Sequence, residues 1–105
     1  MAHYLVEAKP HLHKLKSLRE RLDQGLIKRL KPFGNTLHHS LVNARLKPDG
    51  FAVWEEEDYC SPPLAQERAA VLGEFFAKIS VKTTREEEGW NEVGELPSLW
   101  DKYTF

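Results

Sequence analysis

Short segments rich in β-forming residues, in which apolar and polar side chains tend to alternate, occur at intervals along the chain and predict strands. They comprise residues 3–8, 36–46, 51–58 and 78–84. The sequence KPDG at positions 47–50 is a turn signal between the second and third segments. These two strands are therefore expected to form a hairpin.

Two other segments repeat apolar residues every three or four positions, which is the period of an amphipathic helix. The first spans residues 12–30, and its apolar face consists of Leu12, Leu15, Leu18, Leu22, Leu26 and Leu30. Pro32 and Gly34 are expected to end this helix. The second helix is expected from Ser61 to Phe76, because Ser is a good N-cap and the following prolines suit the first helical position.

The predicted order of elements is β-α-β-β-α-β. It corresponds to a ferredoxin-like α+β fold, a four-stranded antiparallel sheet with two helices on one face. Apolar side chains occupy both faces of the predicted strands, whereas an antiparallel sheet with one wet face should alternate apolar with polar residues. A second copy of the sheet is the simplest cover for the face without helices, so we expect a homodimer that forms through this face.

Length and charge narrow the class of protein. The chain has 105 residues and a mass of 12.2 kDa, which suits one domain over residues 1–84 with a tail over residues 85–105. The formal net charge of -1 argues against nucleic acid or an anionic membrane as the main partner. No segment reads as a signal peptide or a transmembrane helix, and a single cysteine excludes an internal disulfide. We therefore expect a cytoplasmic protein.

The order of elements, the two-sided strands and the short length resemble the dimeric α/β-barrel superfamily over residues 2 to about 84. Within this superfamily, the chain most resembles YCII-related and antibiotic-biosynthesis-monooxygenase-like proteins. The resemblance implies a pocket between the sheet and its helices or partner. In relatives such a pocket serves cofactor-free oxygenation or isomerisation of lactones, or has no assigned use. It also implies a His-Asp pair of the YCII type, for which His11 or His13 could supply the histidine.

The segment WEEEDYCSPPLAQER, residues 54–68, concentrates the candidate chemistry. On a strand, Glu55 and Glu57 face one side while Glu56 and Asp58 face the other, so the four carboxylates cannot converge on one ion. We interpret the segment as a solvated strand end that leads into a helix. The functional alternative keeps Glu56, beside Trp54, as an acid or base.

Five histidines and one cysteine complete the set of candidates. Cys60 precedes a helix, which would lower the pKa of a thiol, but no histidine partner is identifiable by spacing and we expect an idle thiol. No three or four ligands converge, so no metal site and no cofactor are predicted. The predicted catalytic residues are His39, His38 and Glu56, and the predicted ligand-binding residues are His3, Trp54 and His13.

The tail from residue 90 to residue 105 is rich in aromatic residues. Large exposed rings make a sticky surface, so we expect the tail to pack on the domain or on the partner subunit. In this packing ELPSLW at 95–100 docks in an extended form with Leu99 and Trp100 buried. Three functions remain open. The protein is a homodimer that binds a small, partly apolar molecule, a cofactor-independent acid/base enzyme, or a structural or regulatory dimer without a ligand.

Overall fold

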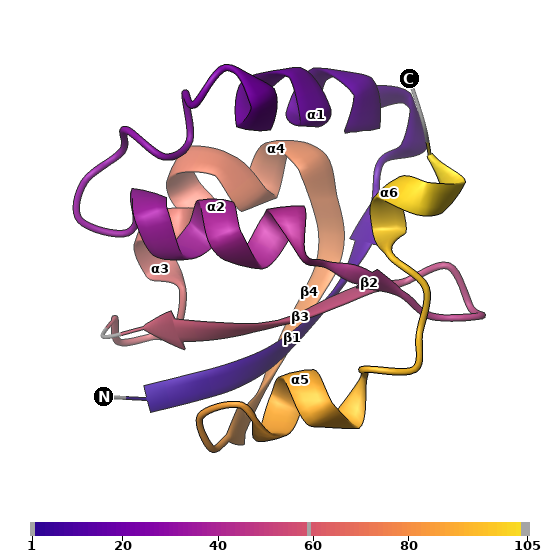
Figure 1. Ribbon diagram of the computed structural model, residues 1–105. Coiled ribbons are helices and arrows are strands. Elements are labelled where there is room, and N and C mark those ends of the chain that lie inside the picture. Colours follow the sequence, from indigo (N-terminus) through magenta and orange to yellow (C-terminus); the bar gives the residue numbers. More distant parts are fainter. Residues whose placement is uncertain (1, 59, 104–105) are drawn as a thin grey trace.

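The computed structural model describes residues 2–58 and 60–103 of the chain, and within them it forms an α+β structure built on a four-stranded antiparallel sheet (Figure 1). The strands are β1 (Ala2–Pro10), β2 (Arg45–Leu46), β3 (Ala52–Asp58) and β4 (Phe76–Thr84). Their order in the sheet is β2-β3-β1-β4, and every neighbouring pair is antiparallel. The predicted α+β class with an antiparallel sheet is confirmed, and the arrangement is compatible with a ferredoxin-like fold.

Helices cover one face of this sheet (Figure 1). They are α1 (Leu15–Asp23), preceded by the short 3-10 turn η1 (Leu12–Lys14), α2 (Gly34–Val42), and a continuous helical segment. That segment comprises α3 (Ala65–Glu67), the π-helical turn η2 (Arg68–Leu72) and α4 (Gly73–Phe75). The main core lies between the helices and the sheet, where Trp54 and Phe75 are among the largest fully buried side chains.

Helix α1 is shorter than the helix predicted over residues 12–30, and the reason lies at Gly25. This glycine has a φ of +72°, a left-handed conformation that glycine adopts without strain. The backbone N–H of Gly25 donates to Leu22 and that of Leu26 donates to Arg21. These two bonds form a Schellman motif, which satisfies the last carbonyl groups of the helix and ends it at Asp23.

The strand predicted over residues 36–46 is wrong for most of its length, because residues 34–42 form α2 and only Arg45–Leu46 is a strand. Leu37, Leu41 and Ala44 are all fully buried, and their spacing of four and three residues is that of one helical face. The start of α2 also requires a glycine, since a Cβ at Gly34 would lie 2.5 Å from the backbone oxygen of Ile27.

The second face of the sheet is covered in part by the chain's own C-terminal region. Helix α5 (Glu88–Glu92) lies on the side of the sheet opposite α1 and α2 (Figure 1). Leu5 and Val53 on this face pack in a buried cluster with Val93, and Trp90 and Leu96 pack against the cluster. Apolar residues on this face, which led us to predict a homodimer, are thus partly covered by the chain itself. The homodimer stays a prediction.

The remainder of the tail runs beside β2. The backbone N–H of Leu46 donates to Pro97, and Ser98 forms an isolated antiparallel bridge with Arg45. Helix α6 (Leu99–Lys102) follows at once, with Leu99 fully buried. The indole of Trp100 is only half-buried and donates a 2.8 Å hydrogen bond to the carbonyl of Leu41. The extended approach predicted for residues 95–100 therefore ends at Ser98, where the side chain caps α6.

Candidate functional site

Strand β3 distributes its four acidic residues between the two faces of the sheet. Glu55 and Glu57 lie on the face that carries α5, and Glu56 and Asp58 lie on the face covered by the other helices. Strand β1 sets His3 opposite Glu57 and Leu5 opposite Glu55 in the antiparallel register. The predicted alternation of the carboxylates is thereby confirmed, and it creates two separate groups of acidic side chains.

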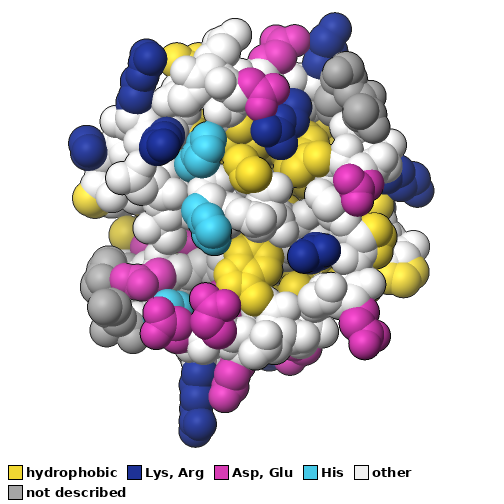
Figure 2. Space-filling model, viewed as in Figure 1, with side chains coloured by type: hydrophobic (Ala, Val, Ile, Leu, Met, Phe, Trp, Pro, Cys, Tyr) yellow, Lys and Arg dark blue, Asp and Glu magenta, His cyan; other side chains and the backbone are white. Residues whose placement is uncertain are grey.

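A cleft of about 330 Å³ opens between α2, the end of β3 and the start of α5. Its lining includes His3, His39, Ser40, Glu55, Glu57 and Trp90. Figure 2 shows histidine and acidic side chains around apolar surface in this region of the molecule. A smaller cleft of about 240 Å³ adjoins it, shares His39 and Trp90, and adds Arg45.

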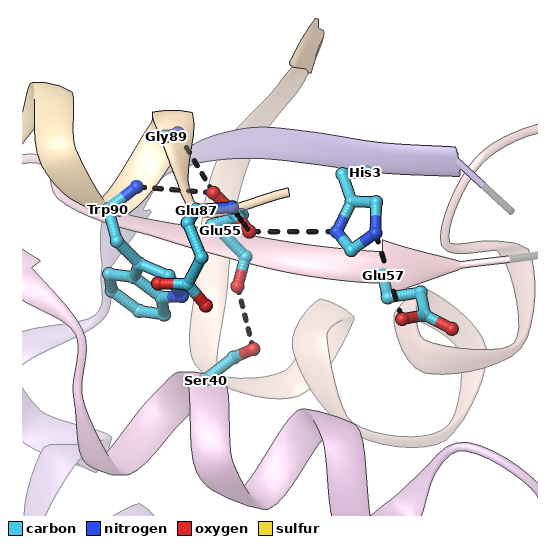
Figure 3. Close-up of polar contacts among 7 residues, drawn as sticks. All are labelled: His3, Ser40, Glu55, Glu57, Glu87, Gly89 and Trp90. Atoms are coloured by element: carbon cyan, nitrogen blue, oxygen red, sulfur yellow. Dashed lines mark hydrogen bonds and ion pairs between the residues drawn. The ribbon is translucent and has the colours of Figure 1, made fainter. Parts of the chain in front are cut away.

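Glu55 fixes the position of α5 at the wall of the cleft (Figure 3). Its buried carboxylate accepts hydrogen bonds from the backbone N–H groups of Glu87, Gly89 and Trp90, at 2.9, 2.8 and 3.2 Å. Negative charge is favourable at these otherwise unpaired N–H groups. A side chain at Gly89 would not fit, because its Cβ would lie 2.8 Å from a carboxylate oxygen of Glu55.

His3 lies between two carboxylates at the base of the cleft (Figure 3). Its Nδ1 atom is 3.6 Å from Glu55, and its Nε2 atom is 3.7 Å from Glu57. These distances exceed a normal hydrogen bond, and the buried Nδ1 atom has no hydrogen-bond partner among the described residues. The imidazole therefore has hydrogen-bonding capacity that no described residue uses.

Helix α2 supplies the opposite wall of the cleft. The hydroxyl of Ser40 donates a 2.8 Å hydrogen bond to the backbone carbonyl of Glu55, which ties α2 to β3 (Figure 3). His39, one turn before Asn43, is exposed and meets the ring of Trp90 edge-on at 6.4 Å between centroids. An imidazole and an indole thus flank the mouth of the cleft.

The second acidic group lies inside the helix-covered face. Glu56 and Glu67 are 2% and 0% exposed. The indole of Trp54 donates a 2.9 Å hydrogen bond to one oxygen of Glu56, whereas the other oxygen and both oxygens of Glu67 meet no hydrogen-bond partner among the described residues. Asp58, also buried, accepts hydrogen bonds from the backbone N–H groups of Cys60 and Leu64.

Burial has a clear electrostatic consequence for this second group. It raises the pKa of Glu56 well above its usual range, and the neighbouring Glu67 raises it further. Burial, followed by the charge of Asp58, raises the pKa of Glu67 to about 7. Both effects follow from removing a carboxylate from water and placing it beside another negative group.

The predicted site residues are dispersed over the molecule. His3 and His39 line the cleft. Trp54 and Glu56 were expected beside each other in a pocket; they are hydrogen-bonded neighbours, but they lie in the core and not in the cleft.

The remaining two predicted residues, His38 and His13, do not line the cleft. Burial lowers the pKa of His38, and the nearby charges of Lys28 and Arg19 lower it further. His13 is exposed on η1, with its ring 6.1 Å from that of His11.

Residues missed by the sequence analysis are Glu55, Glu57 and Trp90 in the cleft and Glu67 in the second acidic group. Glu55 and Glu57 share a strand face with His3, a relation that emerges only once the register of β1 and β3 is known. Glu67 had a detectable signal. It lies three residues after Leu64 and four before Val71, within the apolar stripe of its helix, where a charged residue is unexpected.

None of the helices among the described residues is long and apolar enough to cross a membrane. The chain matches no protein-family model, no curated protein and no solved structure in the comparisons with known proteins.

Proposed function

We propose that the cleft between α2, β3 and α5 binds a small molecule that carries a cationic group beside an apolar or aromatic part. The acidic character of its lining carries the proposal. Glu57, Glu86 and Glu87 line the cleft together with the buried Glu55, and no lysine or arginine is among its described lining residues. A primary amine would be attracted by this charge.

The aromatic side of the ligand is inferred from Trp90 and His39. An indole face is the best aromatic partner for a cation and also contributes a large apolar surface. The ring of Trp90 is half-buried, and its backbone N–H is held by Glu55. The wall that would meet the ligand is thus positioned before binding, which reduces the entropic cost of association.

The proposal is tested with three probes of similar shape, benzylamine, benzyl alcohol and benzoate, and two-dimensional NMR spectra of the labelled protein. Benzylamine should shift the indole signal of Trp90 and the amides of residues 86–90 at millimolar concentration or below, and benzoate should not. Glu57→Gln should weaken benzylamine binding. Glu20→Gln should leave it unchanged, because Glu20 is exposed on α1 outside the cleft.

A second matched pair of variants compares a predicted histidine that lines the cleft with one that does not. His39→Gln should weaken the binding of benzylamine, while His13→Gln should have no effect, although both side chains are exposed. Equal binding of benzoate and benzylamine, or shifts centred outside the cleft, would contradict the proposal.

A cofactor-independent acid/base enzyme is the second candidate, and the position of His3 favours it. An imidazole that lines a cleft beside two carboxylates has the groups that general acid/base chemistry requires. A ligand identified for the cleft should then be turned over by the wild-type protein, bound by His3→Gln and not converted by that variant. Binding without turnover in the wild-type protein would contradict the enzyme and support the binding function only.

The homodimer and the relationship to the dimeric α/β-barrel superfamily belong to the same proposal. The sheet order β2-β3-β1-β4 with antiparallel neighbours supports the relationship. Light scattering at micromolar concentration should give about twice the chain mass of 12.2 kDa. A mass of one chain would contradict the dimer without affecting the cleft.

A further inference from the structure

Three side chains with metal-binding atoms converge where β3 ends and the helix of α3 begins. Asp58, Cys60 and Glu67 each offer one such atom, and the three atoms lie within 4.8 Å of one another. The residues come from a strand end, a loop and a helix. None of these three residues lines the cleft, so the group is separate from the proposed binding site.

The burial of Glu67 is the independent observation that points to a ligand. The residue is fully buried, and neither carboxyl oxygen accepts a hydrogen bond from an N–H group or a hydroxyl among the described residues. The Oε2 atom of Glu56 is likewise buried and without such a donor among the described residues. A buried carboxylate without a donor is costly unless a proton or a cation neutralises it. A proton or a cation beside Glu67 would therefore lower the cost of burying this carboxylate.

The surroundings favour a cation that accepts both sulfur and oxygen ligands. Asp58 accepts two backbone N–H groups, from Cys60 at 3.1 Å and from Leu64 at 2.6 Å, and such bonds favour the ionised carboxylate and orient it. Cys60 is partly exposed, which provides a route for an ion to enter. The π-helical turn that begins at Arg68, directly after Glu67, is an irregularity often found at functional sites.

We propose that Asp58, Cys60 and Glu67 bind one divalent zinc-type cation. Zinc takes thiolate and carboxylate ligands in a tetrahedral arrangement, at about 2.3 Å and about 2.1 Å from the ion. Ligand atoms in such a site are about 3.3 to 3.8 Å apart, so the three side chains need to close by about 1 Å. Three protein ligands leave the fourth position for water or for a small ligand.

This inference reverses one expectation from the sequence, which was that no metal site exists. That expectation rested on histidines that do not converge, on a single cysteine and on the alternation of residues 55–58, and the alternation is real. It separates Asp58 from Glu55 and Glu57, but Glu67 arrives from a different element and completes a group that the spacing along one strand cannot reveal.

The test uses the full chain, reduced and freed of metal, and a titration with Co²⁺ as a spectroscopic substitute for Zn²⁺. The wild-type protein should bind one ion per chain, with the visible bands of a tetrahedral site and a near-ultraviolet thiolate-to-cobalt band. Cys60→Ser should lose the thiolate band, and both Cys60→Ser and Glu67→Gln should weaken binding at least about tenfold. Zn²⁺ should displace Co²⁺ and raise the melting temperature.

Glu57→Gln is the matched control, because Glu57 lies on the same strand as Asp58 but faces the cleft. It should bind Co²⁺ as the wild type does. If Glu67→Gln fails to fold, Cys60→Ser decides the question alone, since Cys60 is not part of the core. The proposal is overturned if Co²⁺ does not bind, if the thiolate band is missing, or if Glu57→Gln rather than Cys60→Ser abolishes binding.

Discussion

Two groups of carboxylates, one on each face of β3, meet opposite conditions in this protein. On the cleft side, Glu55 is 4% exposed, yet three backbone N–H groups donate to it and His3 lies nearby. On the helix-covered side, Glu67 is equally buried and no donor reaches it among the described residues. Burial alone therefore does not determine the role of a carboxylate. The hydrogen-bond donors within reach determine how far the cost of burying the carboxylate is compensated.

The largest expected effect on stability is that of Glu55→Ala. The substitution leaves three N–H groups at the start of α5 without their acceptor, at a cost of about 4 kcal/mol in the free energy of unfolding. The melting temperature should fall by at least about 10 °C. Glu57→Ala is the control, because it removes a carboxylate from the same face of the same strand, and this side chain is 30% exposed whereas that of Glu55 is buried. Similar melting curves for the two variants would contradict this role of Glu55.

Trp100→Ala should have a smaller effect. The ring is half-buried against the core, and its N–H bonds to the carbonyl of Leu41, so truncation removes apolar contact and one hydrogen bond. We expect a loss of about 2 to 3 kcal/mol and a decrease in melting temperature of several degrees. Trp100→Phe keeps most of the apolar surface and should recover part of the loss. An unchanged melting curve for Trp100→Ala would show that the tail does not stabilise the domain.

Strands β1, β3 and β4 were predictable, because β-forming residues gather there, and along β1 and the first part of β3 apolar side chains face the helices at every second residue. Helix α2 was not. Leu37 and Leu41 satisfy a period of two as well as a period of four, and only packing distinguishes these alternatives. The true end of α1 depended on Gly25 in a left-handed conformation, which the sequence permits but does not require.

Only some of the residues that line the candidate cleft could be predicted from the sequence. Two of the six proposed residues, His3 and His39, line it, but the carboxylates that flank His3 depend on strand register and Trp90 depends on how the tail folds back. The second acidic group could not be predicted, because it forms through a contact between β3 and α3, and the local sequence pattern of either element does not indicate that contact. Sequence reasoning found the residue types and missed the contacts between distant segments.

The contrast between the two groups is tested most directly by the pH dependence of unfolding in the presence of a chelator, for the wild type and for Glu67→Gln. The pKa of Glu67 is raised to about 7 in the folded protein. Its protonated form is therefore favoured by folding, and this stability is lost as the pH rises from about 4.5 through 7. The wild type should lose about 2 kcal/mol relative to Glu67→Gln between pH 5 and pH 8. A difference between the two proteins that does not change with pH, or a relative gain for the wild type at pH 8, would contradict the account.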